Sequence, residues 1–138
     1  MQKQWSAVDR YMISSLIPQD DVLRQVLDNN IRAGLPEHDV AANQGQLLAL
    51  FVRMTQAQRI LEIGTLGAYS AIWMARALPP DGKLITLEAD PTHARVARQN
   101  IQLAGLEDRI ELIEGPALRF LENLGDIPPF DLIFIDAD

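Results

Sequence analysis

The sequence predicts an α/β protein in which a helical segment precedes a parallel sheet. Apolar residues recur at helical spacing through residues 1–57, whereas short apolar runs alternate with helices through residues 58–138. Strands that alternate with helices of this length predict a parallel sheet covered on both faces, because right-handed crossovers place the helices there. The length of 138 residues suits one domain. We therefore expect a single domain with a helical part at 1–57 and a sheet core at 58–138.

Three helices are expected in the first part. Ser6 resembles the start of a capping box for the first helix, and Pro18 ends that helix. The second begins at Asp20 or Asp21 and stops at Gly34. The third covers about residues 44–56, and its predicted apolar face consists of Leu47, Leu48, Phe51 and Met54.

Four strands and three helices alternate in the second part. The predicted strands are "RILEIG", "KLITLE", "RIELIEG" and "FDLIFID". A helix follows the first strand until Pro79, and another follows the second strand with Asp90 as its N-cap and Pro91 in its first turn. A third helix begins near Pro116 and ends near Asn123. The continuous apolar run "LIFI" suits an interior strand of a parallel sheet.

Composition narrows the function classes. No run approaches the roughly 20 apolar residues that a membrane span needs, and the N-terminus lacks the pattern of a signal peptide. The absence of cysteine excludes disulfides and thiolate ligands. A net charge of -7 opposes binding to phosphate backbones. We expect a cytoplasmic protein without a membrane partner, and we favour a small molecule over nucleic acid as its partner.

A glycine turn and a later acid form the strongest motif. Gly64 and Gly67 follow the first strand in "EIGTLGAYS", where the start of the next helix directs free N–H groups at a ligand. Glu88 ends the second strand, and a carboxylate there can accept hydrogen bonds from both hydroxyls of a ribose. Each feature alone could also be an ordinary strand end. Together they favour a nucleoside site.

The turn also bears on the kind of nucleoside. A dinucleotide motif would carry a glycine where this sequence has Glu62, whose charge would repel a pyrophosphate. The pattern E-x-G-x-x-G followed by Tyr69 and Ser70 suits a ligand with adenosine at one end and a cationic amino acid at the other. S-adenosylmethionine (SAM) has this chemistry.

Four motifs carry a resemblance to a known family. In their order and spacing, "ILEIGTLGAYSAIWMA", "LITLEADP", "LIEGPA" and "FDLIFIDAD" resemble the metal-dependent catechol and caffeoyl-CoA O-methyltransferases and their bacterial relatives. The resemblance covers about residues 44–138. It implies a Rossmann-like class I methyltransferase sheet, of which the first four parallel strands are present here and the later ones absent. It also implies a homodimer.

By this resemblance, particular residues are expected to surround SAM. Glu62, Gly64 and Ser70 would surround its methionine part, with Gly67 in the same turn, and Gly45 would bring a helix start against its carboxylate. Glu88 would bind the ribose, and Gly115 and Ala117 would border the adenine. The cofactor-binding set is therefore Gly45, Glu62, Gly64, Gly67, Ser70, Glu88, Gly115, Ala117 and Asp136. One departure is Ala68, where relatives commonly carry a second glycine.

The acids at the end of the fourth strand point to a metal. Asp136 matches the position of a ligand to a divalent cation in this family, with Mg²⁺ expected; the plainer reading of Asp136 and Asp138 is a helix cap or a solvated strand end, which we favour for Asp138. The catalytic base and the further metal ligands of the family would follow Asp138, so the catalytic residues stay unknown. We therefore expect these 138 residues to be the N-terminal part of a longer methyltransferase. The 138 residues alone are expected to be inactive.

Several functions remain open at this point. The first is SAM-dependent methylation of a hydroxyl on a small catechol-like or phenolic acceptor. The alternatives are a non-catalytic SAM-binding or assembly module and a methyltransferase for a hydroxylated tRNA base, with a nicotinamide dehydrogenase last because of Glu62. The identity of the acceptor does not follow from the sequence.

Overall fold

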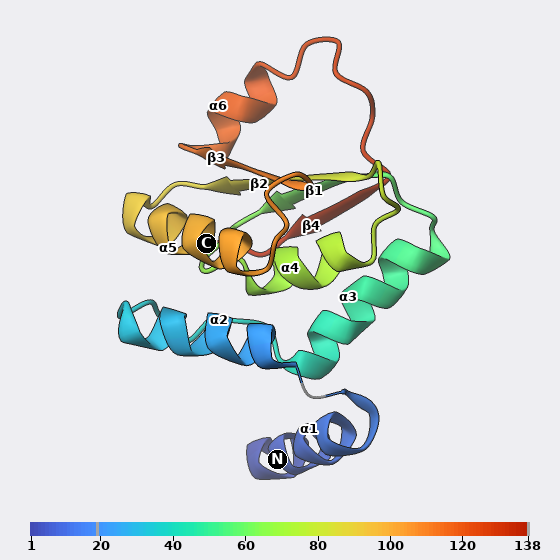
Figure 1. Cartoon of the computed structure of the whole chain (residues 1–138), viewed down its shortest axis with the longest axis vertical. Helices are drawn as coiled ribbons and strands as arrows, with labels where there is room; N and C mark the ends of the chain where they lie inside the picture. The colour runs from blue at the N-terminus through green and yellow to red at the C-terminus, as the bar shows by residue number, and fades with distance from the viewer. Residues whose placement is uncertain (19, 138) are drawn as a thin grey trace.

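The computed structural model describes residues 1–18 and 20–137, which form three N-terminal helices followed by an alternating α/β unit (Figure 1). The helices of the first part are α1 (Gln2–Leu16), α2 (Asp21–Arg32) and α3 (Ala42–Met54). The alternating part is β1 (Arg59–Ile63), α4 (Tyr69–Arg76), β2 (Lys83–Glu88), α5 (Pro91–Leu103), β3 (Ile110–Glu114), α6 (Ala117–Glu122) and β4 (Leu132–Ile135). Every predicted helix and strand is present.

The four strands form one parallel sheet in the order β3-β2-β1-β4. Glu62 lies level with Thr86 on β2 and with Phe134 on β4, and Glu88 lies level with Glu114 on β3. The predicted fold class is confirmed. Because all strands run the same way, their carboxyl ends meet at one edge of the sheet.

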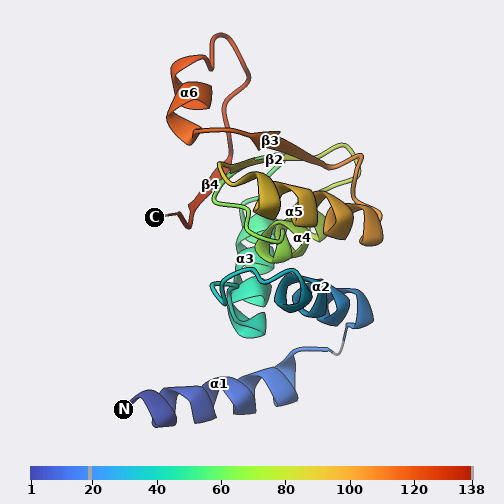
Figure 2. The ribbon, with the colours of Figure 1, turned by 90° about the vertical axis from the view of Figure 1, so that its left-hand side faces the viewer.

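The two faces of the sheet are covered unequally. Helices α4 and α5 pack on one face, while α6 and the connection to β4 lie on the other (Figures 1 and 2). Along β4, Leu132 and Phe134 pack against the core, whereas Ile133 and Ile135 are 56% and 68% exposed. The second face is therefore covered less completely than the prediction of two covered faces implied.

Two expectations for the N-terminal helices are wrong. The first helix begins after Met1, and Ser6 donates from inside it to the carbonyl of Gln2, so Ser6 is not the cap. In α3 the buried positions are Gly45, Ala49 and Val52. Of the predicted apolar face, Leu48 is partly buried, whereas Leu47, Phe51 and Met54 are exposed. Small side chains face the core there because α3 packs closely on α4.

Capping signals placed α2 and α5 correctly. Asp20 accepts a hydrogen bond from the Leu23 N–H at the start of α2, and Gly34 follows its end with a positive φ. Asp90 accepts from Thr92 N–H and His93 N–H at the start of α5. None of the helices within the described ranges is long and apolar enough to cross a membrane.

Candidate functional site

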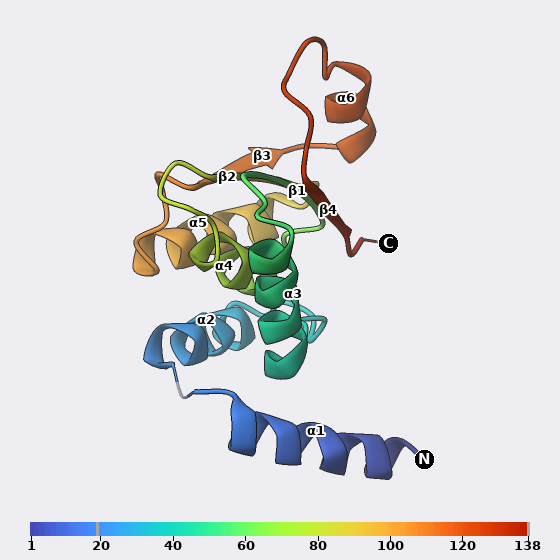
Figure 3. The same ribbon diagram turned by 90° about the vertical axis from the view of Figure 1, so that its right-hand side faces the viewer.

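A cleft of about 570 Å³ opens at the carboxyl ends of the strands. The turn after β1 and the ends of β2, β3 and β4 supply most of its lining, and the loop between α2 and α3 closes one side. Figures 2 and 3 both show this loop on the same side of the molecule as the end of β4. The cleft is thus where an open parallel sheet binds its ligands.

The glycine turn is tight and strained. Gly64, Leu66 and Ala68 all have positive φ, at 97°, 51° and 70°. A side chain on Gly64 would overlap the backbone of Asp136, so only glycine lets the ends of β1 and β4 approach this closely. Ala68 is buried in the left-handed region, where a non-glycine residue costs roughly 1–2 kcal/mol. The glycine that relatives commonly carry at this position would avoid this strain.

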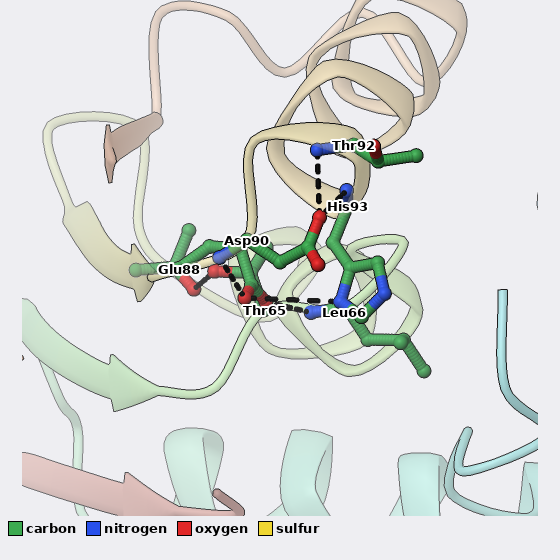
Figure 4. Close-up of polar contacts among 7 residues, drawn as sticks. Thr65, Leu66, Glu88, Asp90, Thr92 and His93 are labelled. Carbon is green, nitrogen blue, oxygen red and sulfur yellow. Dashed lines mark hydrogen bonds and ion pairs between the residues drawn. The ribbon is translucent and has the colours of Figure 1, made fainter. Parts of the chain in front are cut away.

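Glu88 is fixed at the rim of the cleft by the backbone (Figure 4). Its Oε2 accepts a hydrogen bond of 2.8 Å from the Leu66 N–H, and its Oε1 accepts one of 2.9 Å from the Asp90 N–H. His93 Nδ1 lies 3.8 Å from Oε1, and the Glu88 side chain is 11% exposed. Each carboxylate oxygen has a second lone pair, so Glu88 can still accept two hydroxyl groups from a ligand.

Glu62 is fully buried beneath the same turn. It accepts hydrogen bonds of 2.6 Å from Ser70 Oγ and 2.7 Å from Thr86 Oγ1. Thr65 Oγ1 lies 2.6 Å from Thr86 Oγ1 and extends this chain of hydroxyls. Burial raises the pKa of Glu62 to about 7; the hydrogen bonds from Ser70 and Thr86 oppose the shift, and the charges of Asp136 and Glu88 add to it.

The structure brings most of the predicted site residues together. Those that line the cleft are Gly64, Ser70, Glu88, Gly115, Ala117 and Asp136. Glu62 lies beneath the cleft and reaches it through Ser70. Gly67 and Gly45 are packing positions, because a side chain on Gly67 would overlap Asn30 and one on Gly45 would overlap Trp73. Contact of any of these residues with a cofactor stays a prediction.

Asp136 lies just after β4, exposed at the edge of the cleft, and its N–H donates to the carbonyl of Ile63. Within the part of the chain that the structure describes, no group of three or more histidine or acidic side chains is arranged to hold a metal ion. A divalent cation takes six or more oxygen ligands, of which Asp136 could supply one, so a metal role for Asp136 stays a prediction. Asp138 lies outside the described residues.

Sequence reasoning missed part of the site. Asp39 lines the cleft from the α2–α3 loop, and Thr65 and Thr86 complete the hydroxyl chain at Glu62. His38 and His93 also line the cleft. Two signals could have found some of them. His93 lies in the first turn after the Glu88 strand, and Thr86 is a polar residue inside an apolar strand.

A parallel sheet with a glycine turn after β1 and a fixed carboxylate at the end of β2 defines the Rossmann-like cofactor-binding class of α/β proteins. Residues 12–138 match the family model described as O-methyltransferase. The chain belongs to this O-methyltransferase family, as the four sequence motifs predicted.

Individual relatives agree with this assignment. A catechol O-methyltransferase from Mycobacterium tuberculosis is 49% identical over 131 residues, which cover 95% of this chain and 59% of the relative. An O-methyltransferase from Bacillus cereus, solved in complex with S-adenosylhomocysteine (SAH), is 50% identical with a TM-score of 0.96, over 100% of this chain and 64% of that one. A solved structure from Klebsiella pneumoniae is 72% identical with a TM-score of 0.97, over 100% and 63%. The chain thus spans about 60% of the length of these relatives.

Proposed function

We propose that the full-length protein transfers a methyl group from SAM to a hydroxyl oxygen of a small, catechol-like or phenolic molecule. The observation that carries the proposal is the position of Glu88, a carboxylate held by two backbone N–H groups at the rim of the cleft, ready for the two hydroxyls of a ribose. The Bacillus cereus relative, which shares this fold at a TM-score of 0.96, holds the demethylated product SAH.

The charges of the cleft support a cationic ligand. Asp39, Glu88 and Asp136 line it and Glu62 lies beneath it, whereas none of the described lining residues is lysine or arginine. SAM carries a sulfonium and an ammonium group, and both are attracted by carboxylates in a partly enclosed space. The N–H groups of Gly64, Leu66 and Ala68 in the turn are already hydrogen-bonded, so the carboxylate of the same cofactor is better suited to the N–H groups of the first turn of α4.

The residues of this chain would act by binding and orientation. Glu88 would hold the ribose, and the turn with Ser70 would hold the amino-acid end, so that the sulfonium between them is fixed in position. The methyl group can then pass by direct displacement to an acceptor oxygen placed in line with it, and this alignment supplies much of the rate increase. The methyl carbon forms its bond to oxygen as its bond to sulfur breaks, which leaves the neutral thioether SAH, and the proton of the acceptor hydroxyl passes to solvent.

Asp136 would supply one ligand to a magnesium ion in the full-length protein. When bound, such an ion would supply Lewis-acid assistance by making an acceptor hydroxyl easier to deprotonate. With the ion in this role, activity should require added Mg²⁺ and fall in Asp136→Ala, whereas undiminished turnover in a chelator would exclude the metal. Dimerisation and a cytoplasmic location stay predictions.

Isothermal titration of the full-length protein with SAM tests the cofactor directly. We expect binding by the parent protein and a loss of about a hundredfold or more in Glu88→Ala, because two hydrogen bonds to a charged acceptor are removed. Glu114→Ala is the matched control, since Glu114 ends the neighbouring strand level with Glu88 and pairs instead with Arg98. A parent protein that binds no SAM would refute the proposal.

A further inference from the structure

Asp39 is a carboxylate of the cleft that none of the motifs predicted. It is half-buried and lines the cleft together with Gly64, Tyr69 and Ser70 of the glycine turn and the start of α4. Burial raises the pKa of Tyr69, and the charge of Asp39 adds to the shift. Asp39 therefore belongs to the side of the cleft where the α2–α3 loop meets the glycine turn.

A buried amide network fixes Asp39 relative to this turn. Asn30 Nδ2 donates to Asp39 Oδ1 at 3.1 Å, and Asn30 Oδ1 accepts from Asn100 Nδ2 at 3.0 Å. Asn100 Nδ2 also donates to the Gly67 carbonyl at 2.8 Å, and Asn29 Nδ2 donates to Asn100 Oδ1 at 2.9 Å. The network thus ties the α2–α3 loop, α2, α5 and the turn together.

The network is rigid because its amides are inside the protein. Asn30 and Asn100 are 2% and 0% exposed, and a buried amide is strongly destabilising unless its hydrogen bonds are satisfied. Gly67 has no side chain at the point where Asn30 packs against the turn. The network therefore fixes the position of the Asp39 carboxylate relative to the backbone of the turn.

No lysine or arginine lines the cleft beside Asp39 among the described residues, and the basic side chain that acts on its charge is His38 of the same loop. Among the described residues, the ion pairs with lysine, arginine or histidine involve Asp20, Asp21, Glu88 and Glu114, and Asp39 is in none of them. Burial raises the pKa of Asp39, while the hydrogen bond from Asn30 and the charge of His38 oppose the shift, so a further cation brought into the cleft would stabilise the ionised form of Asp39.

We propose that Asp39 binds the ammonium group at the amino-acid end of SAM, with Asn30 and Asn100 as the positioning residues that aim it. This inference rests on the proposed function and assigns the group that recognises the charged amine. Glu88 and Asp39 then divide the cofactor between them, with the ribose on one carboxylate and the ammonium on the other.

Three ligands separate this role from a merely structural one. SAM and SAH both carry the ammonium, whereas 5′-methylthioadenosine keeps the nucleoside and lacks the whole amino-acid part. Each is titrated into the full-length parent protein and into Asp39→Asn, which removes the charge and keeps the acceptor for Asn30. We expect SAM and SAH to lose roughly 10- to 100-fold in affinity and methylthioadenosine to bind unchanged.

Two further variants complete the design. Asp108→Asn is the matched control, because Asp108 is an exposed acid just before β3, at the opposite edge of the sheet. Asp39→Glu keeps the charge, so it should bind SAM more tightly than Asp39→Asn does, and it remains informative if the asparagine variant does not fold.

The outcomes are distinct. Unchanged SAM affinity in Asp39→Asn would overturn the inference, and so would an equal loss for all three ligands, which would mean that Asp39 only shapes the cleft. If the parent protein binds none of the three ligands, the proposed function itself fails, and the failure is then visible before any variant is compared.

Discussion

Two glutamates on neighbouring strands, Glu62 in β1 and Glu88 at the end of β2, are held in different ways. Glu62 is 0% exposed and bonded by hydroxyl groups of side chains, whereas Glu88 lies at the rim of the cleft and is bonded by backbone N–H groups. A hydroxyl can donate or accept, so it accommodates either protonation state of Glu62. A backbone N–H only donates, so it fixes the two Glu88 oxygens in place as acceptors. Burial and donor type thus make one glutamate a proton-binding group and the other a preformed acceptor.

The largest expected effect follows from the raised pKa of Glu62. The ordinary pKa of this carboxyl group is 4.5, and its pKa in the folded protein is about 7. Between these two pH values, Glu62 binds a proton in the folded protein but not in the unfolded chain. The stability contributed by this proton is therefore complete below about pH 4.5 and is lost as the pH rises through 7. The loss amounts to about 3 kcal/mol. In Glu62→Gln this pH-dependent loss of stability should disappear. The variant should therefore become more stable relative to the parent as the pH rises from 5 to 8.

Urea unfolding at several pH values measures this difference. Glu114→Gln is the control, because it removes a carboxylate at the end of the neighbouring strand β3 that is not among the groups that shift the pKa of Glu62. A difference between the parent and Glu62→Gln that stays constant from pH 5 to pH 8 would show that Glu62 does not bind a proton on folding.

A smaller effect is expected on cofactor binding. The cationic SAM should favour the ionised form of Glu62 and lower its pKa in the complex, so binding releases a proton near pH 7. Affinity in the parent should be about tenfold higher at pH 8 than at pH 6. Titration in two buffers of different ionisation enthalpy counts the released protons. The same count in Glu62→Gln would contradict this assignment and place the proton on another group of the cleft.

The sequence was sufficient to predict the fold and the part of the site that lies at the ends of the strands. Helix caps such as Asp90 and strand endings such as Gly64 are local signals, and each is physically sufficient to start or stop an element. The end of β2 put Glu88 at the cleft, because parallel strands share one edge.

What the sequence could not show depends on contacts between distant segments. Asn30 and Asn100 meet although they are 70 residues apart, and neither lies in a recognisable motif. The buried face of α3 was misassigned because Gly45 and Ala49 are small rather than strongly apolar, and the space they fill is set by Trp73 on the partner helix. Hydrophobic periodicity detects large side chains, so it misses a face that packs closely through small ones.

Thr86→Val gives the smallest effect and the sharpest test of how Glu62 is held. Valine keeps the shape of threonine but removes the hydroxyl that donates to Glu62 Oε1 at 2.7 Å. Because that hydrogen bond favours the ionised carboxylate, the pKa of Glu62 should rise further in the valine variant. The pH at which stability falls should then move upward by about one unit, which corresponds to about 1 kcal/mol of unfolding free energy. Thr86→Ser keeps the hydroxyl and should follow the parent profile. If the valine variant also follows it, the hydrogen bond from Ser70 alone balances the burial of Glu62, and Thr86 serves only to pack the strand.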